Sequence, residues 1–211
     1  MERKGSTSQA RHASRHRCTT RAETATYSSA TAEPANIDQG ANETTLQGAG
    51  ADVWGYGGET YDQYTALYRP GGADSTSTTT VEVDAQSNTN GWARSGIMLR
   101  DSVPGATTSL GYAVLSLTPS NGVSLAWDNS SSGYLNQQVN TASVSGPVWL
   151  RLIRNATQVT GEYSTNDSAW TTVATETLTG SNSTEDVGMF TCAHNATTDG
   201  QATFTGFTIT G

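Results

Sequence analysis

The chain has 211 residues and a formal net charge of −8, a length that fits one large β-domain or two small ones. No apolar run reaches the roughly 18 residues that a transmembrane helix needs. Thr, Ser, Gly and Val dominate and apolar residues do not recur at the helical period, so the composition favours an all-β fold with almost no helix.

Charge is distributed unevenly along the sequence. Residues 1–22 carry six basic side chains against one acid, a net of +5, whereas residues 23–211 carry five arginines against eighteen acids, a net of −13. Lys4 is the only lysine. Because phosphate neutralisation needs clustered Lys and Arg, the acidic body argues against nucleic acid as a partner.

The first segment, residues 1–34, is rich in Ser, Thr, Arg and His and lacks apolar periodicity, so we expect a disordered tail. It is basic like the start of a signal peptide, but no apolar stretch follows, and the pattern is therefore not that of a secretory signal. A solvated tail or linker is the favoured interpretation, and an arm for anionic surfaces is the alternative. Residues 35–211 are expected to form one β-domain.

From residue 36 onward, turn signals separate strand-like segments at about 8–12 residues each, which is typical of a sandwich or jelly roll. Strands are expected near residues 43–48, 52–56, 63–69, 78–86, 92–100, 110–118, 122–127, 133–139, 148–154, 158–164, 170–174, 187–193 and 201–209. Residues 148–154 (VWLRLIR) alternate in polarity, as expected for a strand with two distinct faces.

Residues 91–101 (GWARSGIMLRD) begin a run of three antiparallel strands joined by turns at 103–105 and 119–122. We expect this sheet to present candidate recognition residues on one face. These are Arg94, Arg100, Tyr112 and Trp127.

Six blocks in this order resemble the concanavalin A-like sandwich domains appended to secreted bacterial and archaeal glycoside hydrolases. The blocks are residues 48–55 (GAGADVWG) with 64–70 (YTALYRP), 92–102 (WARSGIMLRDS), 118–122 (TPSNG), 148–154 (VWLRLIR), 163–173 (YSTNDSAWTTV) and 193–208 (AHNATTDGQATFTGFT). The resemblance covers residues 37–211 and implies a jelly-roll sandwich of two antiparallel sheets that binds sugar or mediates adhesion. Fold does not dictate function, so the ligand is not implied.

This sequence departs from the family pattern at several points. Cys192 stands where the family usually has Ser, and Gly206 and Thr208 replace polar and apolar residues of the last strand. The segment at residues 55–62 (GYGGETYD) is longer than usual. We expect this insertion to reshape one end of the binding face.

Catalytic patterns are weak. A retaining glycosidase needs two carboxyl groups about 5–5.5 Å apart. Glu82 and Asp84 share one face of a strand but are better interpreted as an outer polar row, and Glu59 and Asp62 have loop spacing. No G-x-S-x-G motif accompanies His194. A glucanase-like hydrolase is therefore the least favoured hypothesis.

Aromatic residues give the positive signal, because sugar rings stack on Trp and Tyr while their hydroxyls need polar partners. Trp92, Trp149 and Trp170 are assigned to packing. Trp127, together with Tyr134 beyond a Ser-rich loop, is predicted to form a platform at a loop rim, with Trp54 half-buried.

Polar candidates complete the predicted site. Arg100 and Asp101 end a strand and are expected to hold sugar hydroxyls, an ion pair between them being the alternative. Asp52, His194 and Asn195 are further candidates, although His194 with Asn195 also fits a structural role at a sheet corner.

Calcium is a candidate cofactor, because several loop acids offer oxygen ligands, but no D-x-D-x-D-G loop is present. The acids are Asp52, Asp62, Asp74 and Asp128. Cys18 and Cys192 do not have metal or redox spacing, and a bridge between them is not indicated. Six N-x-S/T sequons fit a glycosylated surface protein. They begin at Asn42, Asn129, Asn155, Asn166, Asn182 and Asn195.

The leading hypothesis is a non-catalytic, extracellular or cell-surface module or adhesin that binds a polysaccharide or surface glycan. The alternative is a structural protein of a cell surface or virion that self-assembles. The two hypotheses differ in outcome, because the module is expected to be a monomer that a polysaccharide retards.

A body without lysine and with a large acidic excess is also expected of a halophilic source, with an ordinary acidic secreted domain as the alternative. Repulsion among the acids then predicts unfolding at low salt and a melting temperature that rises with KCl. A melting temperature that stays flat from low to molar KCl would contradict the halophilic hypothesis.

Overall fold

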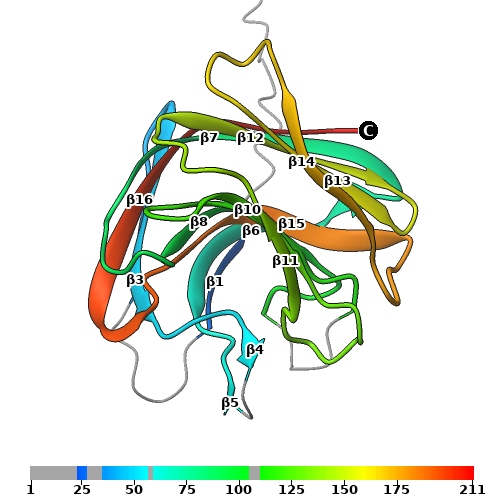
Figure 1. Cartoon of the computed structure of the whole chain (residues 1–211), viewed down its shortest axis with the longest axis horizontal. Helices are drawn as coiled ribbons and strands as arrows, with labels where there is room; N and C mark the ends of the chain where they lie inside the picture. Colours follow the sequence, from blue (N-terminus) through cyan, green and yellow to red (C-terminus); the bar gives the residue numbers. More distant parts are fainter. Residues whose placement is uncertain (1–22, 28–34, 57–58, 105–109) are drawn as a thin grey trace, which may run out of the picture.

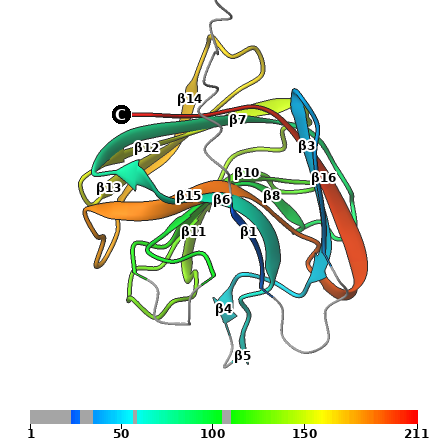
Figure 2. The same ribbon diagram turned by 180° about the vertical axis from the view of Figure 1, so that it is seen from behind.

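The computed structural model describes residues 23–27, 35–56, 59–104 and 110–211, which form two stacked β-sheets (Figures 1 and 2). Every pairing within the sheets is antiparallel. This architecture confirms the predicted all-β sandwich of two antiparallel sheets. Within the described ranges, no helix has the length and apolar character to cross a membrane.

Sheet A has seven strands in the order β1-β6-β15-β8-β9-β10-β11. Their bounds are β1 Glu23–Tyr27, β6 Tyr64–Asp74, β15 Thr184–Cys192, β8 Arg94–Arg100, β9 Ala113–Thr118, β10 Gly122–Trp127 and β11 Gln137–Asn140. The three consecutive strands expected from residue 92 onward are β8, β9 and β10, which lie side by side.

Sheet B also has seven strands, in the order β14-β13-β12-β7-β16-β3-β2. Their bounds are β14 Thr171–Thr177, β13 Gln158–Ser164, β12 Val148–Asn155, β7 Thr76–Gln86, β16 Asn195–Thr210, β3 Glu43–Gly50 and β2 Asn36–Gln39. A separate hairpin of β4 (Gly55–Tyr56) and β5 (Glu59–Thr60) projects below sheet A in Figure 1.

Two short edge strands, β1 and β2, have no counterpart among the strands expected from the sequence. β1 falls inside the predicted tail, where Glu23–Tyr27 pairs with β6, and β2 pairs with β3. Both have weak local patterns and gain their hydrogen bonds from a neighbouring strand, which is a tertiary effect. The remainder of the tail, and with it Cys18, lies outside the described residues.

The main core lies between the sheets, as the alternation in β12 predicts. Val148, Leu150 and Leu152 are buried against sheet A, while Trp149 and Arg151 on the opposite face are partly exposed. Burying each such aliphatic side chain contributes roughly 1.5–3 kcal/mol. This core joins the two sheets into one domain.

Sheet A is buried on its other face as well. The residues of β8, β9 and β10 are buried throughout, and a second apolar cluster forms on the side away from sheet B. It contains Val53, Tyr64, Ala66, Tyr68, Met98, Val103, Tyr112, Val114, Ala126, Leu135, Phe190 and Cys192. We call this group the outer cluster. Burial on both faces explains why these strands have long apolar runs rather than strict alternation.

A buried ion pair connects the sheets. Oε1 of Glu185 in β15 lies 3.7 Å from Nη2 of Arg154 in β12 and accepts a hydrogen bond from the Asn182 backbone N–H at 3.1 Å. Burial raises the pKa of Glu185 to about 7, although the Arg154 cation and the Asn182 N–H act in the opposite direction. The folded state therefore favours the protonated carboxyl group.

Glu185→Gln should remove a pH dependence of stability. Because the folded pKa lies above the unfolded value of 4.5, the native state binds the proton more tightly, and the free energy of unfolding falls as pH rises from about 4.5 to about 7. The variant lacks this loss. The free energy of unfolding of the variant minus that of wild type should therefore increase by on the order of 1–3 kcal/mol as the pH rises from 4 to 8. Urea unfolding of both proteins across this range measures the difference, and a difference independent of pH would refute the assignment.

Candidate functional site

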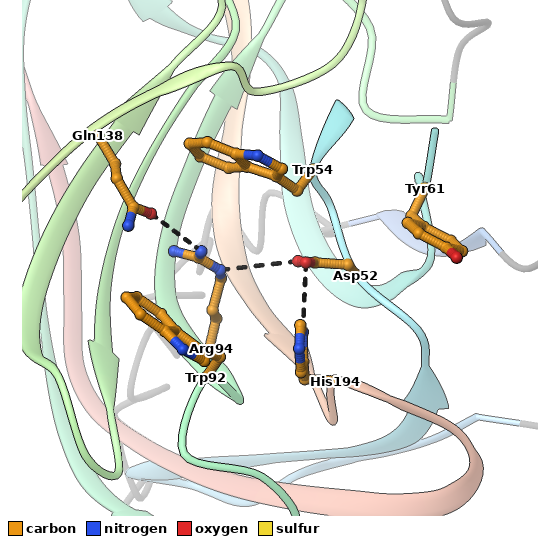
Figure 3. A pocket seen from close by; sticks show the side chains of 7 residues that line it. All are labelled: Asp52, Trp54, Tyr61, Trp92, Arg94, Gln138 and His194. Carbon is orange, nitrogen blue, oxygen red and sulfur yellow. Dashed lines mark hydrogen bonds and ion pairs between the residues drawn. The ribbon is translucent and has the colours of Figure 1, made fainter. Parts of the chain in front are cut away.

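A pocket opens where β8 begins and β15 ends, on the face of sheet A turned away from sheet B (Figure 3). Its volume is about 670 Å³, within the range of small-molecule sites. Its lining comprises Asp52, Trp54, Tyr61, Trp92, Arg94, Gln138 and His194.

The segment after β3 supplies one wall of the pocket. Gly50 ends β3 with a positive φ of 149°, and a Cβ there would lie 2.4 Å from the Gln63 carbonyl oxygen, so the close approach requires glycine. The chain then returns on itself: the Tyr61 N–H donates to the Trp54 carbonyl and the Gln63 N–H to the Asp52 carbonyl, each at 3.0 Å. These bonds fix the backbone of the wall that carries Asp52 and Trp54.

Arg94, the first residue of β8, lies between two indole rings (Figure 3). Its guanidinium carbon is 5.7 Å from the ring centroids of both Trp54 and Trp92, and the residue is 3% exposed. Nη2 donates to Gln138 Oε1 at 3.2 Å, and Nε lies 3.8 Å from Asp52 Oδ1. Cation–π attraction of about 0.5–2 kcal/mol per ring holds the two indoles in place.

Asp52 bridges Arg94 and His194. Its Oδ2 lies 3.2 Å from His194 Nδ1. His194 has φ 50° in the turn between β15 and β16, a conformation that is uncommon for residues other than glycine and that is often found at functional sites. The pocket therefore combines apolar ring faces with carboxylate, imidazole and amide groups, which suits a ligand that has both an apolar face and hydroxyl groups.

Four of the residues predicted to take part in recognition come together in this pocket, namely Asp52, Trp54, Arg94 and His194. Asn195 follows His194, but its Oδ1 accepts bonds from the N–H and Oγ1–H of Thr197 at 3.0 and 3.1 Å. Tyr134 is half-buried and packs against Gly55. Neither Asn195 nor Tyr134 is among the residues that line the pocket.

The predicted platform at Trp127 is wrong. Trp127 is 8% exposed and belongs to the core between the sheets. Its even spacing from Val123 and Leu125 on β10 turns it toward sheet B. The polar loop that follows suggested a rim position, but the strand alternation decides the direction.

The predicted sugar contact at Arg100 is also wrong, because Arg100 is 0% exposed. Its Nη1 donates to both carboxylate oxygens of Asp62, at 2.9 and 3.1 Å, and to Tyr64 Oη at 3.1 Å. Its guanidinium lies 4.2 Å from the ring centroid of Tyr112, whose pKa burial raises well above the usual value. Asp101 is partly exposed and outside the pocket lining. The ion-pair alternative was correct in kind, but the partner of Arg100 is Asp62.

Sequence reasoning missed most of the other lining residues. Trp92 was assigned to packing, yet it is partly exposed and lines the pocket. Tyr61 lies in the long segment at residues 55–62, consistent with the expectation that this insertion shapes one end of the face. Gln138 carried no recognisable signal, whereas Arg94 was among the residues expected on the recognition face of the three-stranded sheet.

The acids considered for calcium do not gather into one site. The Asp128 carboxylate accepts bonds from the N–H groups of Ser130 and Gly133 and from the hydroxyls of Ser130 and Ser132, so its oxygens are already occupied. Asp52 and Asp62 pair with arginines. In the described part of the chain, no group of three or more His, Cys, Asp or Glu residues could hold a metal ion. Among the described residues these acids form no such group, and calcium stays a prediction.

Three of the carboxyl groups considered for hydrolysis do not line the pocket, and the side chain of Glu59 lies outside the described part of the structure. Glu82 is on β7 of sheet B, where it accepts a hydrogen bond from Thr205 Oγ1 at 2.7 Å. Asp84 is exposed on the same strand, and Asp62 is held by Arg100. Cys192 is free and buried, and burial raises its pKa to about 12, so its thiol is not activated.

No protein-family model and no curated protein sequence matches the chain. Solved structures share its fold. A functionally unknown protein from Saccharomyces cerevisiae aligns with a TM-score of 0.67 and 20% identity over 84% of this chain and 92% of that one. The GH43 BlXynB protein from Bacillus licheniformis gives 0.57 and 14%, covering 79% of this chain and 32% of its own. An alginate lyase from Corynebacterium sp. gives 0.50 and 10%, covering 87% and 82%. These likenesses show a β-sandwich of the concanavalin A-like kind.

Proposed function

We propose that this protein is a non-catalytic carbohydrate-binding module or adhesin that receives glycan in the pocket beside Arg94. The observation that carries the proposal is the pair of indole rings, Trp54 and Trp92, held on either side of one buried guanidinium within an open pocket (Figure 3). Rings held by their neighbours lose little conformational entropy when a ligand binds, which favours affinity.

Each part of a sugar has a matching group in the pocket. The CH faces of a pyranose stack on indole, which is large and apolar. Hydroxyl groups can donate to the Asp52 carboxylate and accept from the Gln138 amide, while His194 is 28% exposed at its side chain and accessible from the pocket. This mixture is typical of sites where apolar contact supplies affinity and a few polar groups fix orientation.

Binding is favoured over hydrolysis by the charges of the pocket. Among the described residues that line it, Asp52 is the one carboxylate, and it is already paired with Arg94 and His194. Hydrolysis by an acid and its partner carboxylate needs two carboxyl groups, one on each side of the scissile bond.

The alginate lyase that shares this fold is named for a polysaccharide, which supports glycan as the ligand class.

An extracellular or cell-surface location is part of the proposal. Five of the six sequon asparagines are exposed and accessible to glycosylation. They are Asn42, Asn129, Asn155, Asn166 and Asn182. The expected partner is a polysaccharide or a surface glycan.

Trp92→Ala should abolish glycan binding while leaving the fold intact, because Trp92 is partly exposed and lies before β8 rather than in the core. In a screen of neutral and acidic polysaccharides by affinity electrophoresis in high KCl, we expect the Kd of each ligand to rise at least about tenfold.

Trp170→Ala is the matched control for Trp92→Ala. Its indole is also partly exposed, but it packs on Arg151 of sheet B, with a 3.9 Å guanidinium-to-centroid distance, outside the pocket. The control should bind like wild type. Equal losses in the two variants, or retained binding in Trp92→Ala, would show that the glycan binds elsewhere. Absence of binding by the wild-type protein would refute the proposed function.

A further inference from the structure

The face of sheet A that carries the pocket is closed over most of its area. Side chains of the sheet and of the segments packed on it form the outer cluster, and its members Tyr64, Met98, Tyr112, Leu135 and Phe190 are at most 1% exposed. The covering segments, taken over their described residues only, are 51–55 with 61–63, 101–104 with 110–112, and 128–136. Over the described residues of the outer cluster, the face therefore offers a glycan chain no exposed surface.

Buried polar contacts hold these covering segments against the sheet. Arg100 binds Asp62 in the first segment, and Tyr64 Oη donates to the Val103 carbonyl in the second at 2.6 Å. The Val103 N–H donates to Asp186 Oδ2 of β15 at 3.0 Å. Such contacts are costly to break because each leaves a buried polar group without a partner. The cover is thus a fixed part of the fold.

Trp54 separates the outer cluster from the pocket. It packs against the cluster and also lines the pocket. The adjacent Gly55 N–H donates to the Leu135 carbonyl at 2.9 Å, which ties this wall to the third covering segment. A ligand in the pocket therefore meets a wall where it would have to continue over the sheet.

Resting on the proposed function, we propose that the pocket recognises the end of a glycan chain rather than an internal segment. An internal segment must leave its site in two directions, and the wall at Trp54 and the fixed cover close the direction along sheet A. The volume of about 670 Å³ is that of a small-molecule site rather than of an extended groove. The ligand class is therefore a terminal sugar or a short oligosaccharide.

The test uses the full chain and four polysaccharides, xylan, mannan, laminarin and alginate. Each is compared, at equal sugar mass, before and after partial acid hydrolysis, which multiplies chain ends without changing the monomers. Isothermal titration calorimetry gives the number of binding sites per gram and the Kd per site. For any probe that binds, the sites per gram should rise by the same factor as the number of chain ends, with an unchanged Kd.

The outcomes separate the two proposals. If the sites per gram stay constant after hydrolysis, or if binding disappears with the long chains, the protein binds internal segments and the chain-end inference is wrong while the proposed function stands. If neither form of any probe binds, both proposals fail. Trp92→Ala should remove binding to both forms, and Trp170→Ala should retain the dependence on chain ends.

Discussion

The ion pair between the buried guanidinium of Arg100 and Asp62 is the interaction on which the outer face of sheet A, the face turned away from sheet B, depends. Desolvating such a cation costs several kcal/mol, so it persists only where partners replace water. Asp62, Tyr64 and Tyr112 supply these partners, and removing one charge of the pair would cost about 3–5 kcal/mol. The need to neutralise Arg100 therefore holds the segment before β6 on the sheet, and Tyr64 extends the constraint to the loop around Val103.

The same constraint builds the pocket. Asp62 lies between Tyr61 and Gln63, so fixing its carboxylate also fixes the backbone that pairs with Trp54 and Asp52. Arg94 lies six residues before Arg100 on the same face of β8. Arg100 binds a covering segment in the middle of the face, whereas Arg94 fixes the positions of two indole rings at its end. Binding and closure thus come from one strand, which explains how a small pocket forms on a face that is otherwise buried.

Local sequence patterns predicted the fold well but the site only in part. Alternation and turn residues located most strands, because each pattern reports on a few neighbouring residues. Asp52, Trp54 and His194 were found because they lie within recognisable blocks. The prediction for Trp127 was wrong because the polar loop that follows suggested an exposed position. Its even spacing from Val123 and Leu125 on β10 instead directs the side chain into the core between the sheets. Arg100 and Asp62 lie 38 residues apart along the chain. No local sequence pattern encodes a contact over such a separation.

The most direct test of the central claim, that glycan binds in the pocket lined by Trp54 and Trp92, is NMR observation of the five indole N–H signals during titration with a polysaccharide fragment that the protein binds. Each signal is assigned by single substitution. The account predicts that the Trp54 and Trp92 signals shift in a saturable way, while those of Trp127, Trp149 and Trp170 stay in place. Saturable shifts confined to Trp149 and Trp170 would place the glycan on sheet B and contradict the account.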